Sequence, residues 1–281
     1  MAAIDDRKEH ILMTAMTTPL GDRFSAMLDQ CAREHRLAFL LHLTLGDPSP
    51  EASLPLLETL AEAGADAFEL AIPFSDPTAD GPVLEESAHR ALDAGTTVEK
   101  CFSLVRTFRE KHPNVPLSLA TYVNIAVAPG LERFFQSAAA AGFDAAALRD
   151  LPLAMREAEP EWDDAARTAG IGLAASLSGA SCQRSLSGIA KQRGALPFLI
   201  LPERACGSSA VETPAPALLE LEEGNQEDIE KARAAGAAGI IAGTAFGRII
   251  EANLGNAQAM ERAVADYARA MKQACKQMTE S

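Results

Sequence analysis

The sequence predicts a single (βα)₈ barrel, in which eight parallel strands alternate with outer helices, and three observations point to this fold. Eight short apolar runs of strand length are spaced along the chain. Four helical stretches end in an alanine–glycine pair, at residues 63–64, 141–142, 169–170 and 235–236. The 281 residues suit one barrel domain, and no segment looks like a linker. An open, doubly wound sheet is the alternative arrangement of the same units.

The expected strands are apolar on both faces, as is typical of strands covered by helices. They span residues 37–45, 67–72, 117–123, 144–149, 171–177, 197–201, 217–221 and 239–243. Glycine just past a helix favours the left-handed conformation that ends it, so each alanine–glycine pair marks a joint between a helix and the next strand. Because sites in such barrels lie at the C-terminal ends of the strands, we expect the functional residues there.

The two ends of the chain complete this plan. Residues 1–21 are expected to form a leader, and residues 22–281 the barrel domain. Apolar residues recur at helical spacing over residues 23–36 and again over residues 260–278. Both segments are therefore predicted to be amphipathic helices with one face toward the core.

One helix of the barrel should be missing or shortened. Residues 208–216 separate the sixth expected strand from the seventh and contain Pro214 and Pro216. This leaves too little chain for a loop, a helix and a return turn. We expect the sixth outer helix to be absent or short, and the leader or a second subunit to cover the apolar strands that it would leave bare.

Composition limits the possible partners. The chain has 25 Lys and Arg residues against 39 Asp and Glu, a formal net charge of −14, which argues against nucleic acid and anionic membranes. No apolar run is long enough to cross a bilayer, and the acidic start is unlike a signal peptide, so we place the protein in the cytoplasm. The five cysteines lack paired spacing, so we expect no disulfide framework, metal site or cofactor.

Residues 67–82 carry the strongest sign of chemistry. Glu69 is the one acid in an apolar strand, and Asp80 lies on the next loop, whose prolines and glycine prevent regular structure. Two such carboxylates can face one cavity, where burial raises the pKa of one while the other stays ionised. This pair suits acid–base catalysis, although Asp80 could instead be a simple turn residue.

At this point the chain resembles the α subunit of tryptophan synthase over roughly residues 22 to 278. The resemblance is carried by residues 43–48, 63–70, 72–77, 79–82, Tyr122 with Asn124, 150–152, 234–239 and 243–245. It implies a (βα)₈ barrel that cleaves indole-3-glycerol phosphate by retro-aldol chemistry to indole and glyceraldehyde 3-phosphate. It also implies a pyridoxal-phosphate β subunit as a partner, or else self-association.

The resemblance also implies roles for single residues. Glu69 would shuttle protons at indole C3 and the glycerol hydroxyl, and Asp80 would hold the indole N–H. The expected substrate-binding residues, some retained from the family and some altered, are Thr44, Tyr122, His42, Arg149, Gly207, Gly243 and Thr244. The last three belong to a phosphate cradle of which half survives.

Several positions depart from the family pattern. Glu220 and Glu222 stand in place of the glycines of a Gly-Phe-Gly turn, where two carboxylates would repel a phosphate. His42 replaces an aromatic wall residue, and a satisfied core histidine is its simpler interpretation. Arg149 replaces a small residue and could pair with an acid such as Glu69, or bind an anionic group of another substrate.

Three functions remain open from the sequence. The first is a divergent lyase that uses Glu69 and Asp80 on an indole-3-glycerol-phosphate-like substrate, with an altered phosphate site and Arg149 as the new anion contact. The second is an ordinary tryptophan synthase alpha chain. The third is a non-catalytic relative that binds a partner subunit or a small ligand, because Arg149 could pair with the acids and fill the site.

Overall fold

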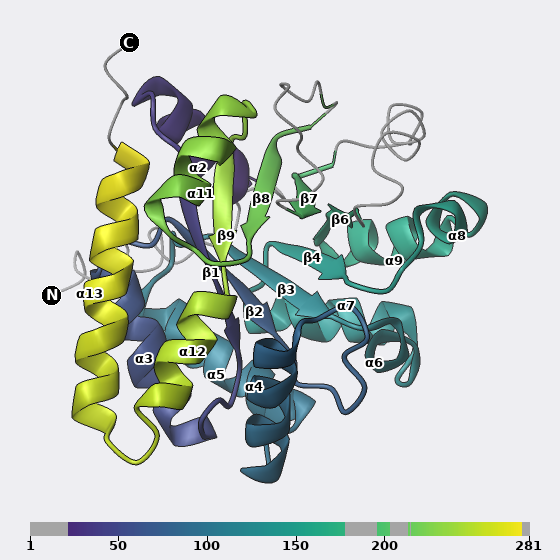
Figure 1. Ribbon diagram of the computed structural model, residues 1–281. Coiled ribbons are helices and arrows are strands. Elements are labelled where there is room, and N and C mark those ends of the chain that lie inside the picture. Colours follow the sequence, from purple (N-terminus) through teal and green to yellow (C-terminus); the bar gives the residue numbers. More distant parts are fainter. Residues whose placement is uncertain (1–21, 178–195, 203–212, 214, 277–281) are drawn as a thin grey trace, which may run out of the picture.

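The computed structural model describes residues 22–177, 196–202, 213 and 215–276, and shows a parallel sheet surrounded by helices (Figure 1). The strands are β1 (Ala38–Thr44), β2 (Ala67–Ala71), β3 (Leu117–Thr121), β4 (Ala145–Leu148), β5 (Gly172–Leu173), β6 (Ala175–Ser176), β7 (Leu199–Pro202), β8 (Ala217–Leu221) and β9 (Gly239–Ala242). Their order in the sheet is β5-β4-β3-β2-β1-β9-β8-β7-β6, and neighbouring strands pair in parallel.

The sheet runs around a barrel because β5 and β6 are two pieces of one stretch of chain. β5 pairs with β4, and β6 pairs with β7 at the other end of the strand order. Ala174 lies between the two pieces and donates its N–H to the carbonyl oxygen of Ala146, 2.8 Å away. The predicted barrel is confirmed, and the open sheet is excluded. All eight expected strands are present, with residues 171–177 divided in two.

Helices surround this sheet, most of them on its outer face (Figure 1). They are α2 (Asp22–Arg33), α3 (Pro50–Glu62), α4 (Pro82–Asp93), α5 (Val98–Lys111), α6 (Val123–Val127), α7 (Leu131–Ala141), α8 (Leu153–Ala158), α9 (Glu161–Ala169), α11 (Gln226–Ala234), α12 (Thr244–Ala252) and α13 (Ala257–Lys276). The glycines of the four alanine–glycine pairs have φ values from 73° to 103°. This left-handed conformation ends each helix and turns the chain into the next strand, as expected.

Helix α2 closes one end of the barrel. Phe24 and Leu28 are buried among interior side chains of the strands, and the ring of Phe24 lies 4.8 Å from that of Phe198. The opposite end, at the C-terminal ends of the strands, holds a cavity. The predicted amphipathic helix therefore acts as a plug, and any ligand must enter from the C-terminal end.

Helix α13 runs along α3 and α12 (Figure 1). Its buried stripe includes Met260, Val264 and Met271, as the sequence predicted. Tyr267 is only partly buried, and its hydroxyl donates to the carbonyl oxygen of Gly224.

Some expectations fall outside the described residues. These are the leader over residues 1–21, most of residues 208–216, and Gly207. The described residues between β7 and β8, namely 213, 215 and 216, are not helical. The missing sixth helix and the cover over its strands therefore stay predictions, as does the boundary between leader and barrel.

Candidate active site

The C-terminal end of the barrel interior carries a polar layer contributed by several strands. The register places His42 of β1 beside Glu69 of β2, and Glu69 beside Ser118 of β3. Side chains alternate along each strand, so these three point to the same side, into the barrel. Arg149 follows β4, and Glu220 lies in β8 on the far side of the barrel.

Glu69 is held by His42 at the bottom of this layer. Its side chain is 1% exposed, and that of His42 is 2% exposed. Nδ1 of His42 lies 2.7 Å from Oε2 of Glu69, in a hydrogen bond that the imidazole N–H donates to the carboxylate. The two residues are neighbours across the β1–β2 ladder, so the strand register itself creates the pair.

The pKa values of this pair move apart. Burial alone would raise the pKa of Glu69, but the His42 hydrogen bond and the charge of Arg149 outweigh it, so the pKa is lowered. Burial alone would lower the pKa of His42, but the hydrogen bond and charge of Glu69 outweigh it, so that pKa is raised. Both shifts favour a carboxylate beside an imidazolium. Glu69 therefore differs from the expected acid of raised pKa, because His42 is bonded to it.

Asp80 is fixed by a tyrosine from β3's C-terminal end. The hydroxyl of Tyr122 donates to Oδ2 of Asp80 at 2.8 Å and accepts the N–H of Ala79 at 3.2 Å. Burial and the Asp80 carboxylate raise the pKa of Tyr122, which keeps the phenol protonated as a donor. Asp80 is therefore more than a turn residue, because a side chain from another strand orients it.

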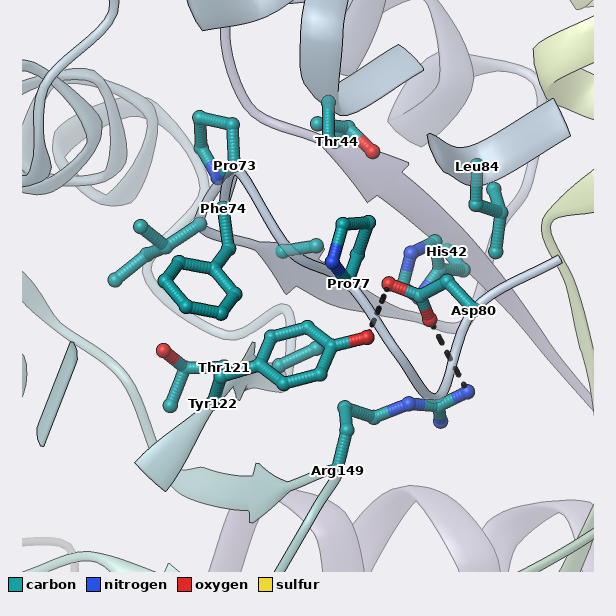
Figure 2. A pocket seen from close by; sticks show the side chains of 14 residues that line it. His42, Thr44, Pro73, Phe74, Pro77, Asp80, Leu84, Thr121, Tyr122 and Arg149 are labelled. Carbon is teal, nitrogen blue, oxygen red and sulfur yellow. Dashed lines mark hydrogen bonds and ion pairs between the residues drawn. The ribbon is translucent and has the colours of Figure 1, made fainter. Parts of the chain in front are cut away.

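Arg149 connects the acids of the site, and Figure 2 shows its ion pair with Asp80. Its guanidinium is 6% exposed, and Nη2 donates to Oε1 of Glu220 at 2.7 Å. Nη2 also lies 3.7 Å from Oδ1 of Asp80, and Nη1 lies 4.0 Å from Oε2 of Glu69. Burial alone would lower the pKa of Arg149, but these three carboxylates outweigh it and raise the pKa. The guanidinium therefore stays charged at the centre of the site.

Several buried polar atoms of this region have no hydrogen-bond partner among the described residues. They are Oε1 of Glu69, Oδ1 of Asp80, Nε and Nη1 of Arg149, Oγ of Ser118 and Oγ1 of Thr121. An unpaired buried donor or acceptor costs about 1–3 kcal/mol. A polar ligand or an ordered water molecule could form hydrogen bonds with these neighbouring donors and acceptors.

A small cavity of about 10 Å³, partly open to solvent, lies above this layer. Its polar lining comes from His42, Thr44, Asp80, Tyr122 and Arg149, and apolar residues such as Phe74 and Leu84 complete the wall (Figure 2). Glu69 does not line this cavity. His42 and Arg149, which both depart from the family residues that the resemblance implies at these positions, line it while contacting Glu69.

The expected phosphate end is only partly described. Gly243 and Thr244 begin α12, with no side chain capping that helix, whereas Gly207 lies outside the described residues. Glu220 is 26% exposed and bonded to Arg149, and Glu222 is exposed. The carboxylate of Glu220 is therefore compensated by a cation, which the sequence analysis did not anticipate.

The nearest partner of Arg149, Glu220, was not predicted from the sequence, whereas Glu69, which was, lies 4.0 Å away. The other acid close by in the chain, Asp150, accepts the N–H of Val123 through Oδ1 at the start of α6. The available signal was that Arg149 and Glu220 are both departures from the family at interior positions, one adding a positive charge and the other a negative charge. In the described parts of the chain, no group of three His, Cys, Asp or Glu residues could hold a metal ion.

Comparison with known proteins gives the family. A model described as "Tryptophan synthase alpha chain" matches residues 28–198. The chain belongs to the tryptophan synthase alpha chain family. The resemblance noted in the sequence is thereby confirmed, and with it the prediction of a lyase. Within the described residues, no helix has the length and apolar character needed to cross a membrane.

Relatives in this family match nearly end to end. A tryptophan synthase alpha chain of Aliivibrio fischeri is 37% identical over 270 residues, covering 90% of this chain and 98% of the relative. One from Klebsiella pneumoniae is 35% identical over 273 residues, covering 91% and 99%. The solved subunit alpha of Legionella pneumophila aligns with a TM-score of 0.79 at 25% identity over 90% and 98% of the two chains.

A second similar solved structure is that of a multisubunit complex. It describes a tryptophan synthase a2b2 complex of Pyrococcus furiosus, and a chain of it aligns with a TM-score of 0.74 at 28% identity. The alignment covers 84% of the present chain and 97% of that one.

Proposed function

We propose that this chain is a carbon–carbon lyase that splits an indole-3-glycerol-phosphate-like substrate by retro-aldol chemistry, with an altered phosphate site. The observation that carries the proposal is the arrangement of Glu69, Asp80 and Arg149 at the C-terminal end of the barrel. Arg149 lies within 4.0 Å of an oxygen of each acid, and each acid keeps one buried oxygen without a hydrogen-bond partner among the described residues. The site is therefore arranged to receive polar groups of a ligand.

The reaction needs the groups that this site supplies. A carbon–carbon bond to an aromatic ring breaks only after the ring carbon is protonated, so an acid must be positioned there and a negative charge must stabilise the ring cation. The Glu69 and His42 pair holds a proton beside the cavity, and Asp80, held by Tyr122, offers the negative charge. The bond electrons return to the ring as the hydroxyl loses its proton and becomes a carbonyl.

Arg149 is proposed as the new anion contact. It lines the cavity, its Nε and Nη1 have no hydrogen-bond partner among the described residues, and Nη2 already binds one carboxylate, that of Glu220. An anionic group of the substrate could bind beside or in place of Glu220, since guanidinium groups bind carboxylates and phosphates strongly. This contact would compensate for Glu220 and Glu222, which replace the expected glycine turn.

The first test is a steady-state assay with indole-3-glycerol phosphate on the purified chain. The variants Glu69→Gln and Asp80→Asn should each lower kcat about 100-fold or more, because each removes a charge on which proton transfer depends. Asp76→Asn is the matched control. Asp76 is an exposed acid on the same loop as Asp80, so its change should leave kcat within about twofold.

Three outcomes separate the open functions. Turnover that falls in both acid variants, with a weak dependence on the phosphate of the substrate, supports the divergent lyase. The same losses with a strong dependence on the phosphate indicate the ordinary tryptophan synthase alpha activity. No turnover in the wild type would leave only a binding role. Turnover unchanged in Glu69→Gln would contradict the part proposed for Glu69 in the reaction.

We further propose that the protein acts in the cytoplasm and associates with a pyridoxal-phosphate tryptophan synthase beta-type subunit. The support is the Pyrococcus furiosus relative, whose structure is that of an a2b2 complex. Size-exclusion chromatography of the two purified chains should give a species larger than either alone. Separate elution at micromolar concentration would contradict the association.

A further inference from the structure

His42 occupies a position between Glu69 and the cavity. The His42 side chain lines the cavity, whereas Glu69 does not. The two are joined through Nδ1 of His42 and Oε2 of Glu69 at 2.7 Å. Of these two bonded residues, His42 is therefore the one that a ligand in the cavity would contact.

The imidazole is held in one orientation. Glu69 accepts the hydrogen bond from Nδ1, which leaves Nε2 as the ring nitrogen available to a ligand. On its other side the ring lies against Gly243, where an added Cβ would come within 3.0 Å of Cβ and 3.3 Å of Cγ and Cδ2 of His42. A side chain at position 243 would push the ring away, so the glycine preserves its place.

The surrounding charges decide the protonation of the ring. The charged groups that act on His42 are Glu69 from β2, Asp80 from the following loop and Arg149 from β4's C-terminal end. The two carboxylates raise the pKa of His42 and Arg149 lowers it, as burial does, and the net shift is upward. An imidazolium is therefore present at a higher pH than for a solvated histidine, which is the form that can donate a proton.

We propose that His42 is the catalytic residue that exchanges the proton with the ligand, and that Glu69 is a positioning residue that acts through it. This rests on the proposed lyase function. Nε2 of the imidazolium gives its proton to C3 of the indole ring. The C3–C1′ bond then breaks, its electron pair returns to the ring, and the C1′ hydroxyl becomes a carbonyl as its proton passes to Nε2. Substrate atoms are redistributed into two products, no water is consumed, and His42 ends protonated.

A direct readout is the titration of His42 by nitrogen NMR. The chain has five histidines, so the His42 resonances are assigned by their loss in His42→Gln. The wild-type ring should titrate above the ordinary range. Glu69→Gln removes the carboxylate that raises the pKa of His42, while the ring stays buried, so the titration of His42 should move to lower pH. Adding indole should shift the Nε2 resonance, because the proposal places that atom against the ligand.

A second readout isolates proton transfer from the phosphate site. Exchange of the C3 hydrogen of indole for deuterium in D₂O needs only the acid and the aromatic pocket. His42→Phe, which places an aromatic ring where the resemblance expects one, and His42→Gln should slow this exchange about 100-fold or more. His89→Gln, on α4 and outside the cavity lining, is the matched control and should leave the rate unchanged.

The pH profile distinguishes the roles of the two residues. In Glu69→Gln the pH profile of the exchange rate should still show the titration of His42, with its apparent pKa lowered. In the His42 variants this titration should be absent from the profile. Full exchange in His42→Phe together with its loss in Glu69→Gln would overturn the proposal, since Glu69 would then act directly. Circular dichroism and the melting temperature show that each variant is folded.

The failure of the lyase function can be told apart from the failure of this inference. If the wild type neither cleaves indole-3-glycerol phosphate nor exchanges indole, the proposed lyase function fails. The NMR experiment then decides the role of His42. An Nε2 resonance that does not respond to indole, or a His42 titration unchanged in Glu69→Gln, would also overturn the role proposed for His42.

Discussion

Arg149 is a buried guanidinium in contact with three carboxylates from different parts of the barrel. Nη2 bonds Glu220 and lies near Asp80, and Nη1 lies near Glu69. The desolvation of such a charge is offset only by partners held in good geometry, so removing one partner costs more than the pair contributes. At the residue scale the site is therefore a coupled set of charges, and single substitutions affect every member.

We predict that Arg149→Ala lowers the free energy of unfolding by roughly 3–5 kcal/mol, because it leaves the carboxylates of Glu69, Asp80 and Glu220 without their shared cation. The double variant Arg149→Ala with Glu220→Gln should recover about 1–3 kcal/mol of that loss. The free energies of unfolding are measured by urea denaturation for the wild type, both single variants and the double variant, which together form a double-mutant cycle. Additive losses would show that Arg149 and Glu220 are not coupled.

At the element scale, the strands follow from local sequence and their joints from glycine. The apolar runs and the alanine–glycine pairs predicted all eight strand regions, because a run buried on both faces and a left-handed glycine are visible in the sequence. The division of residues 171–177 at Ala174 was not predictable, since it depends on which neighbour each half pairs with. The plug formed by α2 was expected as an amphipathic helix, but its position required the closed barrel.

We predict that Phe24→Ala lowers the free energy of unfolding by about 3–5 kcal/mol. The Phe24 ring is fully buried against Phe198, so its removal leaves a cavity at the closed end of the barrel. Ser25→Ala, at the next and exposed position of α2, should change the stability by no more than about 0.5 kcal/mol. Chemical denaturation of both variants checks this, and equal effects would show that α2 does not act as a plug.

At the scale of the whole molecule, the sequence by itself determined the barrel, the family and the two acids of the site. Glu69 and Asp80 stand out because an acid in an apolar strand and an acid on a proline-rich loop are local features. Four further residues predicted from the sequence lie together in the lining of the cavity, namely His42, Thr44, Tyr122 and Arg149.

Only the tertiary structure decided which of these residues touch. Glu69 bonds His42 because β1 and β2 pair in one register, and Arg149 bonds Glu220 because the barrel brings the ends of β4 and β8 across from each other. These contacts join residues far apart in the chain, and nothing local to either partner specifies them. The physical reason is that pairing and closure depend on the whole sheet, whereas helix, strand and turn signals depend on a few neighbouring residues.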